Sequence, residues 1–179
     1  ARRDVRAIRA GAALGLAEMI ASGVTAIADM YMRTGAVAQE IAAAGISANL
    51  SCGGVQFTED FDPDTLSDCV AQRALTQEWH GWNDGQILVD TSIHAEYTSF
   101  AAPGMWEYLA RYAADHGLGM HVHISETRTE HEECIARHGA TPLQTLDRYG
   151  VWDVRALAAH CVWCTPEDMA LMAKKGVTA

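Results

Sequence analysis

The stretch "MHVHISET", Met120–Thr127, closes an apolar run with two histidines and a glutamate. We predict a strand over Leu118–Ser125. Side chains alternate between the two faces of a strand, so His121 and His123 share one face. Glu126 follows in the loop after that strand. The stretch therefore predicts a buried strand that carries imidazoles and an acid at its carboxyl end.

Strands and helices alternate outward from this stretch in both directions. Further extended segments are predicted at Gly23–Asp29, Ile46–Val55, Gln86–His94, Val154–Val162 and from residue 177 onward. Helices are predicted at Ala1–Ser22, Thr34–Gly45, Asp62–Gly81, Pro103–His116, Thr129–His138, Thr141–Gly150 and Thr165–Gly176. No Asn-Gly turn joins two strands. Apolar strands separated by helices imply right-handed βαβ units and a parallel sheet.

Two parallel architectures fit this order, an open doubly wound sheet or a (β/α)8 barrel, also called a TIM barrel. The sequence lacks the G-x-G-x-x-G loop that would favour the first. Polar residues end successive predicted strands: Asp29, Cys52, His94, His123 with Glu126, and His160. A barrel collects its catalytic groups at that rim. We therefore predict an α/β fold of the TIM-barrel type.

The predicted strands are too few to close a barrel. The chain has 179 residues, with five full strands and the start of a sixth, whereas a closed barrel needs eight strands and typically about 250 residues. We expect residues 1–179 to form one partial catalytic domain, with the amino- and carboxyl-terminal parts of a parent protein missing. The apolar edges of an incomplete barrel predict self-association, so a homo-oligomer is an open expectation.

Composition excludes several classes of partner. Apolar residues make up 49% of the chain and the formal net charge is −10, which argues against binding to nucleic acid or an anionic membrane. No apolar run approaches the roughly 18–20 residues of a membrane-spanning helix. Arg6, Arg9 and Glu18 interrupt the first apolar segment, which is typical of an amphipathic helix rather than a signal peptide. The five cysteines, an odd number, favour free thiols and a cytoplasmic location.

Histidines at the strand ends are the candidate functional residues. A single histidine in an apolar strand is more often a packed core residue. A His-x-His-x-x-Glu at a strand end favours function, because neutral imidazole binds zinc-like metals and a nearby carboxylate shuttles protons to metal-bound water. His160 in "AAHCVW" stands one βα unit later. For His94 in "SIHAEYTSF", a structural and a functional role are equally compatible with the pattern.

Two further clusters have simpler interpretations. "CVWC", Cys161–Cys164, is a C-x-x-C that suits a zinc half-site or a redox pair. The other cysteines supply no second pair at a useful spacing, so buried thiols are the preferred interpretation. "RTEHEEC", Arg128–Cys134, is interpreted as the solvated start of a helix, with acids near its N-terminus.

Four segments resemble a known family in their order and spacing: "GVTAIADMY", "IHAEYTSF", "HVHISET" and "AAHCVW". Together they are similar to the amidohydrolase superfamily, in the branch of S-adenosylhomocysteine/5′-methylthioadenosine deaminases, guanine and cytosine deaminases and triazine chlorohydrolases. The resemblance implies a barrel of the metal-dependent hydrolase type, of which strands 2 to 6 and the start of 7 are present. It also implies a hydrolase that deaminates or dechlorinates a small nitrogen heterocycle, such as an aminopurine, an aminopyrimidine or an adenosine derivative.

The resemblance also implies roles for four residues. His123 corresponds to the metal-ligating histidine of the fifth strand, and Glu126 to the proton shuttle that contacts the substrate ring. His160 corresponds to the sixth-strand histidine that polarises the attacking hydroxide, and His94 to a substrate-contacting histidine. His121 matches no family ligand and is left as packing or support. One divalent metal is implied, zinc first, with iron or manganese as alternatives.

The chain departs from the family pattern in ways that leave alternatives open. The His-x-His of the first strand and the aspartate of the eighth are not in this sequence, so we expect the chain alone to bind metal weakly. Cys52 stands where homocysteine-nucleoside deaminases often carry arginine, which weakens homocysteine-bearing substrates. The rival hypothesis is a non-catalytic β/α domain, or degenerate paralogue, with structural histidines. A third is a redox or metal-storage role for Cys161 and Cys164.

Overall fold

The computed structural model describes residues 4–179, so the first three residues of the predicted helix Ala1–Ser22 lie outside the described part. The strands are β1 (Ala26–Met30), β2 (Ser47–Ser51), β3 (Ile87–Val89), β4 (Thr91–Ile93), β5 (Met120–Ile124) and β6 (Ala156–His160). They form two sheets, ordered β1-β2-β3 and β4-β5-β6. Neighbouring strands within each sheet all pair in parallel. The predicted parallel α/β fold is confirmed.

The two sheets are joined by one bent strand. Only Asp90 separates β3 from β4, and these two segments pair with different neighbours, β2 and β5. An isolated parallel bridge between Gly54 and Ile93 continues the contact past the bend. A further parallel bridge joins Thr178 to Leu157 of β6, where the next strand was expected to start. The strands therefore follow one another in chain order, as in a section of a barrel.

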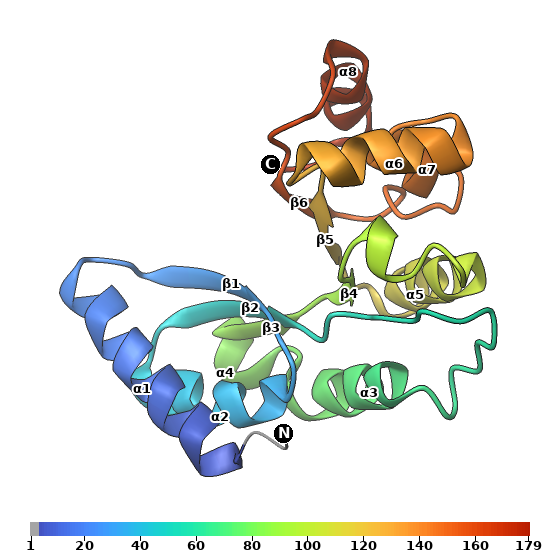
Figure 1. Ribbon diagram of the computed structural model, residues 1–179. Helices are drawn as coiled ribbons and strands as arrows, with labels where there is room; N and C mark the ends of the chain where they lie inside the picture. Colours follow the sequence, from blue (N-terminus) through green and yellow to red (C-terminus); the bar gives the residue numbers. More distant parts are fainter. Residues whose placement is uncertain (1–3) are drawn as a thin grey trace.

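Helices cover the outer side of this arc of strands (Figure 1). They are α1 (Val5–Ala21), α2 (Thr34–Ala44), α3 (Ser67–Trp79), α4 (Trp82–Gly85), α5 (Pro103–His116), α6 (Arg128–His138), α7 (Pro142–Asp147) and α8 (Pro166–Lys175). A short 3-10 helix, η1 (Glu96–Thr98), follows β4. Among the helices of residues 4–179, none has both the length and the apolar character needed to cross a membrane.

The predicted helix Asp62–Gly81 begins five residues later than expected, at Ser67, because Asp62 forms a turn instead of starting the helix. Its carboxylate accepts hydrogen bonds from the backbone N–H of Asp64 at 2.9 Å and from the hydroxyl of Thr65 at 3.1 Å. Aspartate side chains compete in this way for local backbone donors and so favour turns over helix. The helix begins only at Ser67.

Two apolar clusters form the core. The larger one packs α5 and α7 against β5 and β6 around the buried Trp106 and Trp152. The smaller one packs α1, α2 and α3 against β2 and β3. Between them, the buried carboxylate of Asp90 accepts hydrogen bonds from Gly119 N–H at 2.8 Å and from Arg155 at 2.5 Å. Gly119 and Arg155 precede β5 and β6, so this contact fixes the amino-terminal ends of those strands.

Candidate active site

Three imidazoles meet at the carboxyl ends of adjacent strands. The ring centroids of His94 and His123 lie 5.0 Å apart, and those of His123 and His160 lie 5.3 Å apart. The parallel register places Ile124 beside His160 and so brings the ends of β5 and β6 level. Residues separated by 66 positions along the chain therefore share one region of the arc, as the strand-end pattern predicted.

Glu126 adds a carboxylate to this group. Its Oε2 lies 3.7 Å from Nε2 of His160, and the two side chains are 42% and 39% exposed. This distance exceeds that of a hydrogen bond, so the two groups are close neighbours that are not bonded to each other. The acid and the imidazole both face solvent, where a substrate or a water molecule has access.

His123 has the hydrogen bonding expected of a metal ligand. Its Nδ1 lies 2.7 Å from the backbone carbonyl oxygen of His94. A carbonyl oxygen only accepts, so Nδ1 carries a proton, and the tautomer with this proton has its lone pair on Nε2. Such a bond fixes the tautomer and orientation of metal-binding histidines. Within residues 4–179 no hydrogen bond engages Nε2, so the ring fits a divalent metal at that atom.

His94 is positioned as a neutral hydrogen-bonding group. The Thr98 hydroxyl lies 3.4 Å from its Nδ1, and the Tyr97 ring meets it edge-on at 6.0 Å. Burial lowers the pKa of His94, and the neighbouring His123 lowers it further, while Glu126 acts in the opposite direction. The ring is therefore uncharged at neutral pH.

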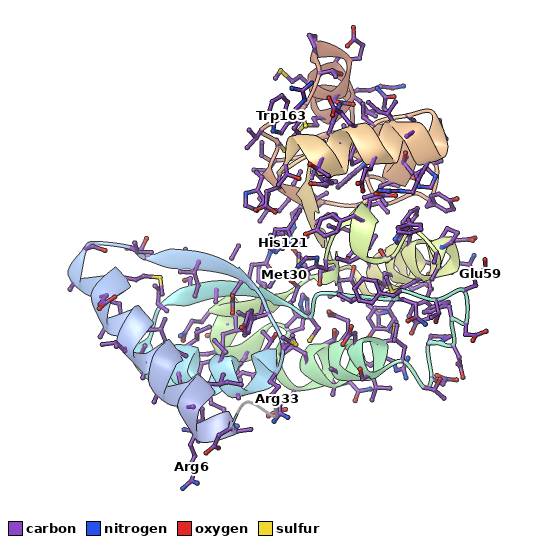
Figure 2. The ribbon with its side chains drawn as sticks, viewed as in Figure 1. Arg6, Met30, Arg33, Glu59, His121 and Trp163 are labelled. Atoms are coloured by element: carbon purple, nitrogen blue, oxygen red, sulfur yellow. The ribbon has the colours of Figure 1, made fainter. Side chains whose placement is uncertain are left out.

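His121 lies on β5, on the same face of the strand as His123, and is labelled in Figure 2. Its side chain is buried, and its ring centroid lies 6.0 Å from that of His123. Burial lowers the pKa of His121 to about 4, and His123 and His160 contribute to the shift against the effect of Asp90. This neutral ring packs beneath His123, in agreement with the supporting role expected for it.

The backbone is strained where these strands end. Ser125, His160 and Cys161 have φ values of 48°, 74° and 54°, in the left-handed region that residues other than glycine rarely occupy. Two hydrogen bonds join the strained ends: Cys161 N–H donates to Ile124 O at 2.9 Å, and Trp163 N–H to Ser125 O at 3.0 Å. Strain of this kind persists where the surroundings impose it and concentrates at functional sites.

The segment Arg128–Cys134, predicted to be solvated, is buried in part. Glu130 and His131 are only 3% and 8% exposed. Thr127 caps α6 by accepting a hydrogen bond from Glu130 N–H at 3.2 Å, and the Glu130 carboxylate turns back toward the preceding loop. The T-x-x-E spacing of a capping box was the signal in the sequence that could have revealed this arrangement.

A buried ion pair connects the loop after β4 to the end of α6. The fully buried Glu96 carboxylate accepts hydrogen bonds from Arg137 Nε at 3.1 Å and Nη2 at 2.7 Å, and lies 2.8 Å from His138 Nε2. The ligand-type atoms of Glu96, His138 and Cys134 lie close together. Arg137 already occupies both carboxylate oxygens, and burial raises the pKa of the Cys134 thiol to about 12. The group is therefore an ion pair, and it ties down the loop that carries His94.

Other strand-end residues lie in different surroundings. Asp29 lines a groove of about 600 Å³ between α1 and β1, where burial raises its pKa. Cys52 is buried in the smaller core cluster, and burial raises the pKa of its thiol to about 11. Gly53 borders the histidines, because a Cβ there would lie 3.6 Å from the Cβ of His94 and 3.3 Å from the sulfur of Met30, which ends β1 (Figure 2).

The C-x-x-C segment forms a turn next to His160. Cys164 N–H donates to Cys161 O at 3.3 Å, and both side chains are half-buried free thiols. A hydrogen bond between the thiols lowers the pKa of Cys161 and raises that of Cys164. These contacts agree with ordinary packed thiols.

Parallel strands covered by outer helices, with imidazoles and an acid at the carboxyl rim, are the features of a section of a TIM barrel. The amidohydrolase family model matches residues 4–178, and the chain belongs to this family. The predicted family and fold are thereby confirmed.

Similar proteins include a 5-methylthioadenosine/S-adenosylhomocysteine deaminase of Moorella thermoacetica, 40% identical over 167 residues. A 5′-deoxyadenosine deaminase of Methanothermobacter thermautotrophicus is 34% identical over 168 residues. The matches cover 93% and 94% of this chain but only 38% of each relative.

Solved structures show the same fold. An adenosine deaminase of Xanthomonas campestris with bound zinc matches with a TM-score of 0.85 at 24% identity, covering 98% of this chain and 39% of that one. An atrazine chlorohydrolase of Arthrobacter aurescens complexed with zinc matches with a TM-score of 0.82 at 21% identity, covering 97% and 42%. The chain thus spans about two-fifths of the length of these proteins.

Proposed function

We propose that residues 1–179 form the central section of the catalytic barrel of a metal-dependent deaminase that acts on an adenosine derivative. The observation that carries this proposal is the position of Glu126, 3.7 Å from His160 and in the loop directly after the strand that holds His123. The function belongs to the full-length gene product, since the relatives are much longer than this chain. The remaining metal ligands would come from the rest of that product.

His123 is the metal ligand that this chain contributes, through Nε2, because His94 O holds the proton on Nδ1. A divalent metal bound there lowers the pKa of a water molecule and so supplies a nucleophile at neutral pH. Zinc is the first choice, given the zinc-bound structural relatives, with iron and manganese as alternatives.

The other proposed roles belong to Glu126, His160 and His94. Glu126 accepts the proton of the attacking water and delivers it to a ring nitrogen of the substrate, which requires an accessible carboxylate of this kind. His160 stabilises the charge that develops on the oxygen that the attacking water adds to the ring carbon. His94, which is neutral, orients the heterocycle by hydrogen bonding.

The leaving group is proposed to be an amine. The relatives at 34–40% identity are deaminases of adenosine derivatives, whereas the chlorohydrolase resembles this chain at 21% identity. Within the deaminases, we favour substrates with an uncharged 5′ substituent over S-adenosylhomocysteine. Cys52 supports this choice, because cysteine stands where homocysteine-nucleoside deaminases often carry arginine, and a thiol has no positive charge with which to bind a substrate carboxylate.

The test is Glu126→Gln in the full-length gene product. Substrates to screen are 5′-substituted adenosines, aminopyrimidines and chlorotriazines. We expect unchanged metal content by mass spectrometry and a fall in kcat of about 100-fold or more, the usual contribution of a general acid–base group. Glu132→Gln is the control, since Glu132 is an exposed residue of α6. Near-normal turnover by Glu126→Gln would remove the proposed role, and a wild-type protein without metal or turnover would favour the non-catalytic alternative.

A further inference from the structure

The position of Glu126 depends on its backbone. Its side chain is 42% exposed, and its Oε2 lies 3.7 Å from Nε2 of His160, beyond hydrogen-bond distance. The residue before it, Ser125, has a φ of 48°, so the turn that carries Glu126 is strained. A strained turn keeps one conformation only if its surroundings hold it.

The Glu130 carboxylate supplies that hold. Its Oε1 accepts a hydrogen bond from Ser125 N–H at 3.1 Å, and its Oε2 accepts one from Glu126 N–H at 2.8 Å. A weaker contact reaches Thr127 N–H at 3.5 Å. Glu130 is 3% exposed, so water competes little for these bonds. Both oxygens are therefore committed to the backbone of the turn.

These contacts exceed what a helix cap requires. In a capping box, the carboxylate binds only the N–H of the capping residue. In the corresponding box of α8, the Asp168 carboxylate accepts a backbone hydrogen bond from the capping Thr165 N–H at 2.9 Å, and its other oxygen accepts one from the Thr141 hydroxyl at 2.6 Å. In α6 the bond to the capping Thr127 is the longest of the three, and the shorter ones reach the two residues before it. The side chain is thus directed at the turn of the candidate site.

His131, which follows Glu130 in the sequence, also contacts this turn through its side chain. His131 Nδ1 lies 3.0 Å from the hydroxyl of Ser125. The carbonyl of Ser125 accepts Trp163 N–H at 3.0 Å, from the loop after β6 that follows His160. The turn is thereby bound both to α6 and to the end of β6, which carries His160.

We propose that Glu130 is a positioning residue, whose buried carboxylate holds the Ser125–Thr127 turn and so aims Glu126 at the reacting atoms. This inference rests on the proposed function, in which Glu126 moves the proton. A misplacement of about 1 Å at such a group lowers the rate about 100-fold. Glu130→Gln replaces one accepting oxygen by an NH2 group that faces a backbone N–H, and so disturbs the turn without removing Glu126.

The experiment is a double-mutant cycle in the metal-loaded, full-length gene product. We expect Glu130→Gln alone to lower kcat 10- to 100-fold, with KM and metal content within about twofold of wild type. In the Glu126→Gln background, the same change should lower kcat less than about threefold, because a residue that acts through Glu126 has nothing left to position. Equal losses in both backgrounds, or no loss in either, would overturn the inference.

Two controls separate positioning from folding. Thr141→Ala removes the cap of α7, where the hydroxyl accepts a hydrogen bond from Gln144 N–H at 3.3 Å, and leaves every residue of the Ser125–Thr127 turn in place, so it should lower the melting temperature and keep kcat. If Glu130→Gln does not fold, Glu130→Asp retracts the carboxylate by one methylene and should show the same kcat loss and the same dependence on Glu126. A Thr141→Ala variant with a kcat loss as large as that of the Glu130 variant would count against positioning. Failure of the proposed function appears separately, as full activity of Glu126→Gln alone.

Discussion

Replacing Arg137 by methionine should destabilise the protein strongly, because it leaves the carboxylate of Glu96 buried without its main partner. Arg137 donates two hydrogen bonds to Glu96, at 3.1 and 2.7 Å, and the Glu96 side chain is fully buried. The hydrogen bonds that Arg137 donates to Glu96 raise the pKa of the guanidinium, which stays charged. Methionine keeps an unbranched apolar chain against Phe100, whose ring lies 4.6 Å from the guanidinium.

The expected loss is about 3 kcal/mol. Breaking a buried ion pair by removing one partner costs about 3–5 kcal/mol. The lower end applies here, because Arg137 is 24% exposed and His138 keeps its contact with Glu96 at 2.8 Å. Arg128→Met on the same helix is the matched control. Its pair with Glu132 is 68% and 58% exposed, and such pairs contribute less than about 1 kcal/mol.

Urea unfolding followed by circular dichroism measures both losses. Adding Glu96→Gln to Arg137→Met should restore at least half of the lost free energy of unfolding, since it removes the charge left in the interior. Equal effects of Arg137→Met and Arg128→Met would refute the reasoning, and so would a double variant less stable than Arg137→Met.

Further stability predictions concern a tight glycine and a buried acid. Gly119→Ala places a Cβ 2.6 Å from Arg155 O and 2.8 Å from both Asp90 carboxylate oxygens, so it should lower the free energy of unfolding by about 2 kcal/mol. In Gly35→Ala the new Cβ, in α2, has no atom within 4 Å, so this change should raise the free energy of unfolding by about 0.5–1 kcal/mol. Burial raises the pKa of Asp68, so its charged form is disfavoured in the folded state, and stability falls as the pH rises from 3.8 through the folded pKa. Asp68→Asn should therefore be more stable than wild type at pH 7, and this difference in stability should disappear in acid. Urea unfolding of both proteins at pH 7 and in acid measures the difference, and a difference that grew on acidification would contradict the prediction.

The sequence predicted the order of strands and helices well because that order depends on local patterns. Apolar strands, glycines at helix ends and prolines in first turns are all readable within a few residues. Gly45 ends α2 with a φ of 78°, as the pattern indicated. Asp62 was misplaced because an aspartate before a helix supports either a cap or a turn, and only its contacts with Asp64 and Thr65 decide between them.

Part of the candidate site was also predictable. The histidines of β5 and β6 could be placed together because parallel strands end at a common rim. The contact between Glu96 and Arg137 could not, since it joins residues 41 positions apart whose side chains give no local signal. Glu130 was missed for a different reason. A run of acids is typical of a solvated helix start, and the T-x-x-E spacing occurs twice there, from Thr127 to Glu130 and from Thr129 to Glu132, so the spacing alone does not identify the buried acid.

The central claim is that His123 anchors a metal beside Glu126 and His160. Anomalous diffraction at the metal absorption edge, from crystals of the zinc-loaded full-length gene product, tests it directly. We expect a peak about 2.0–2.1 Å from Nε2 of His123. A peak at Glu96, Cys134 and His138 instead, or none near His123, would contradict the account.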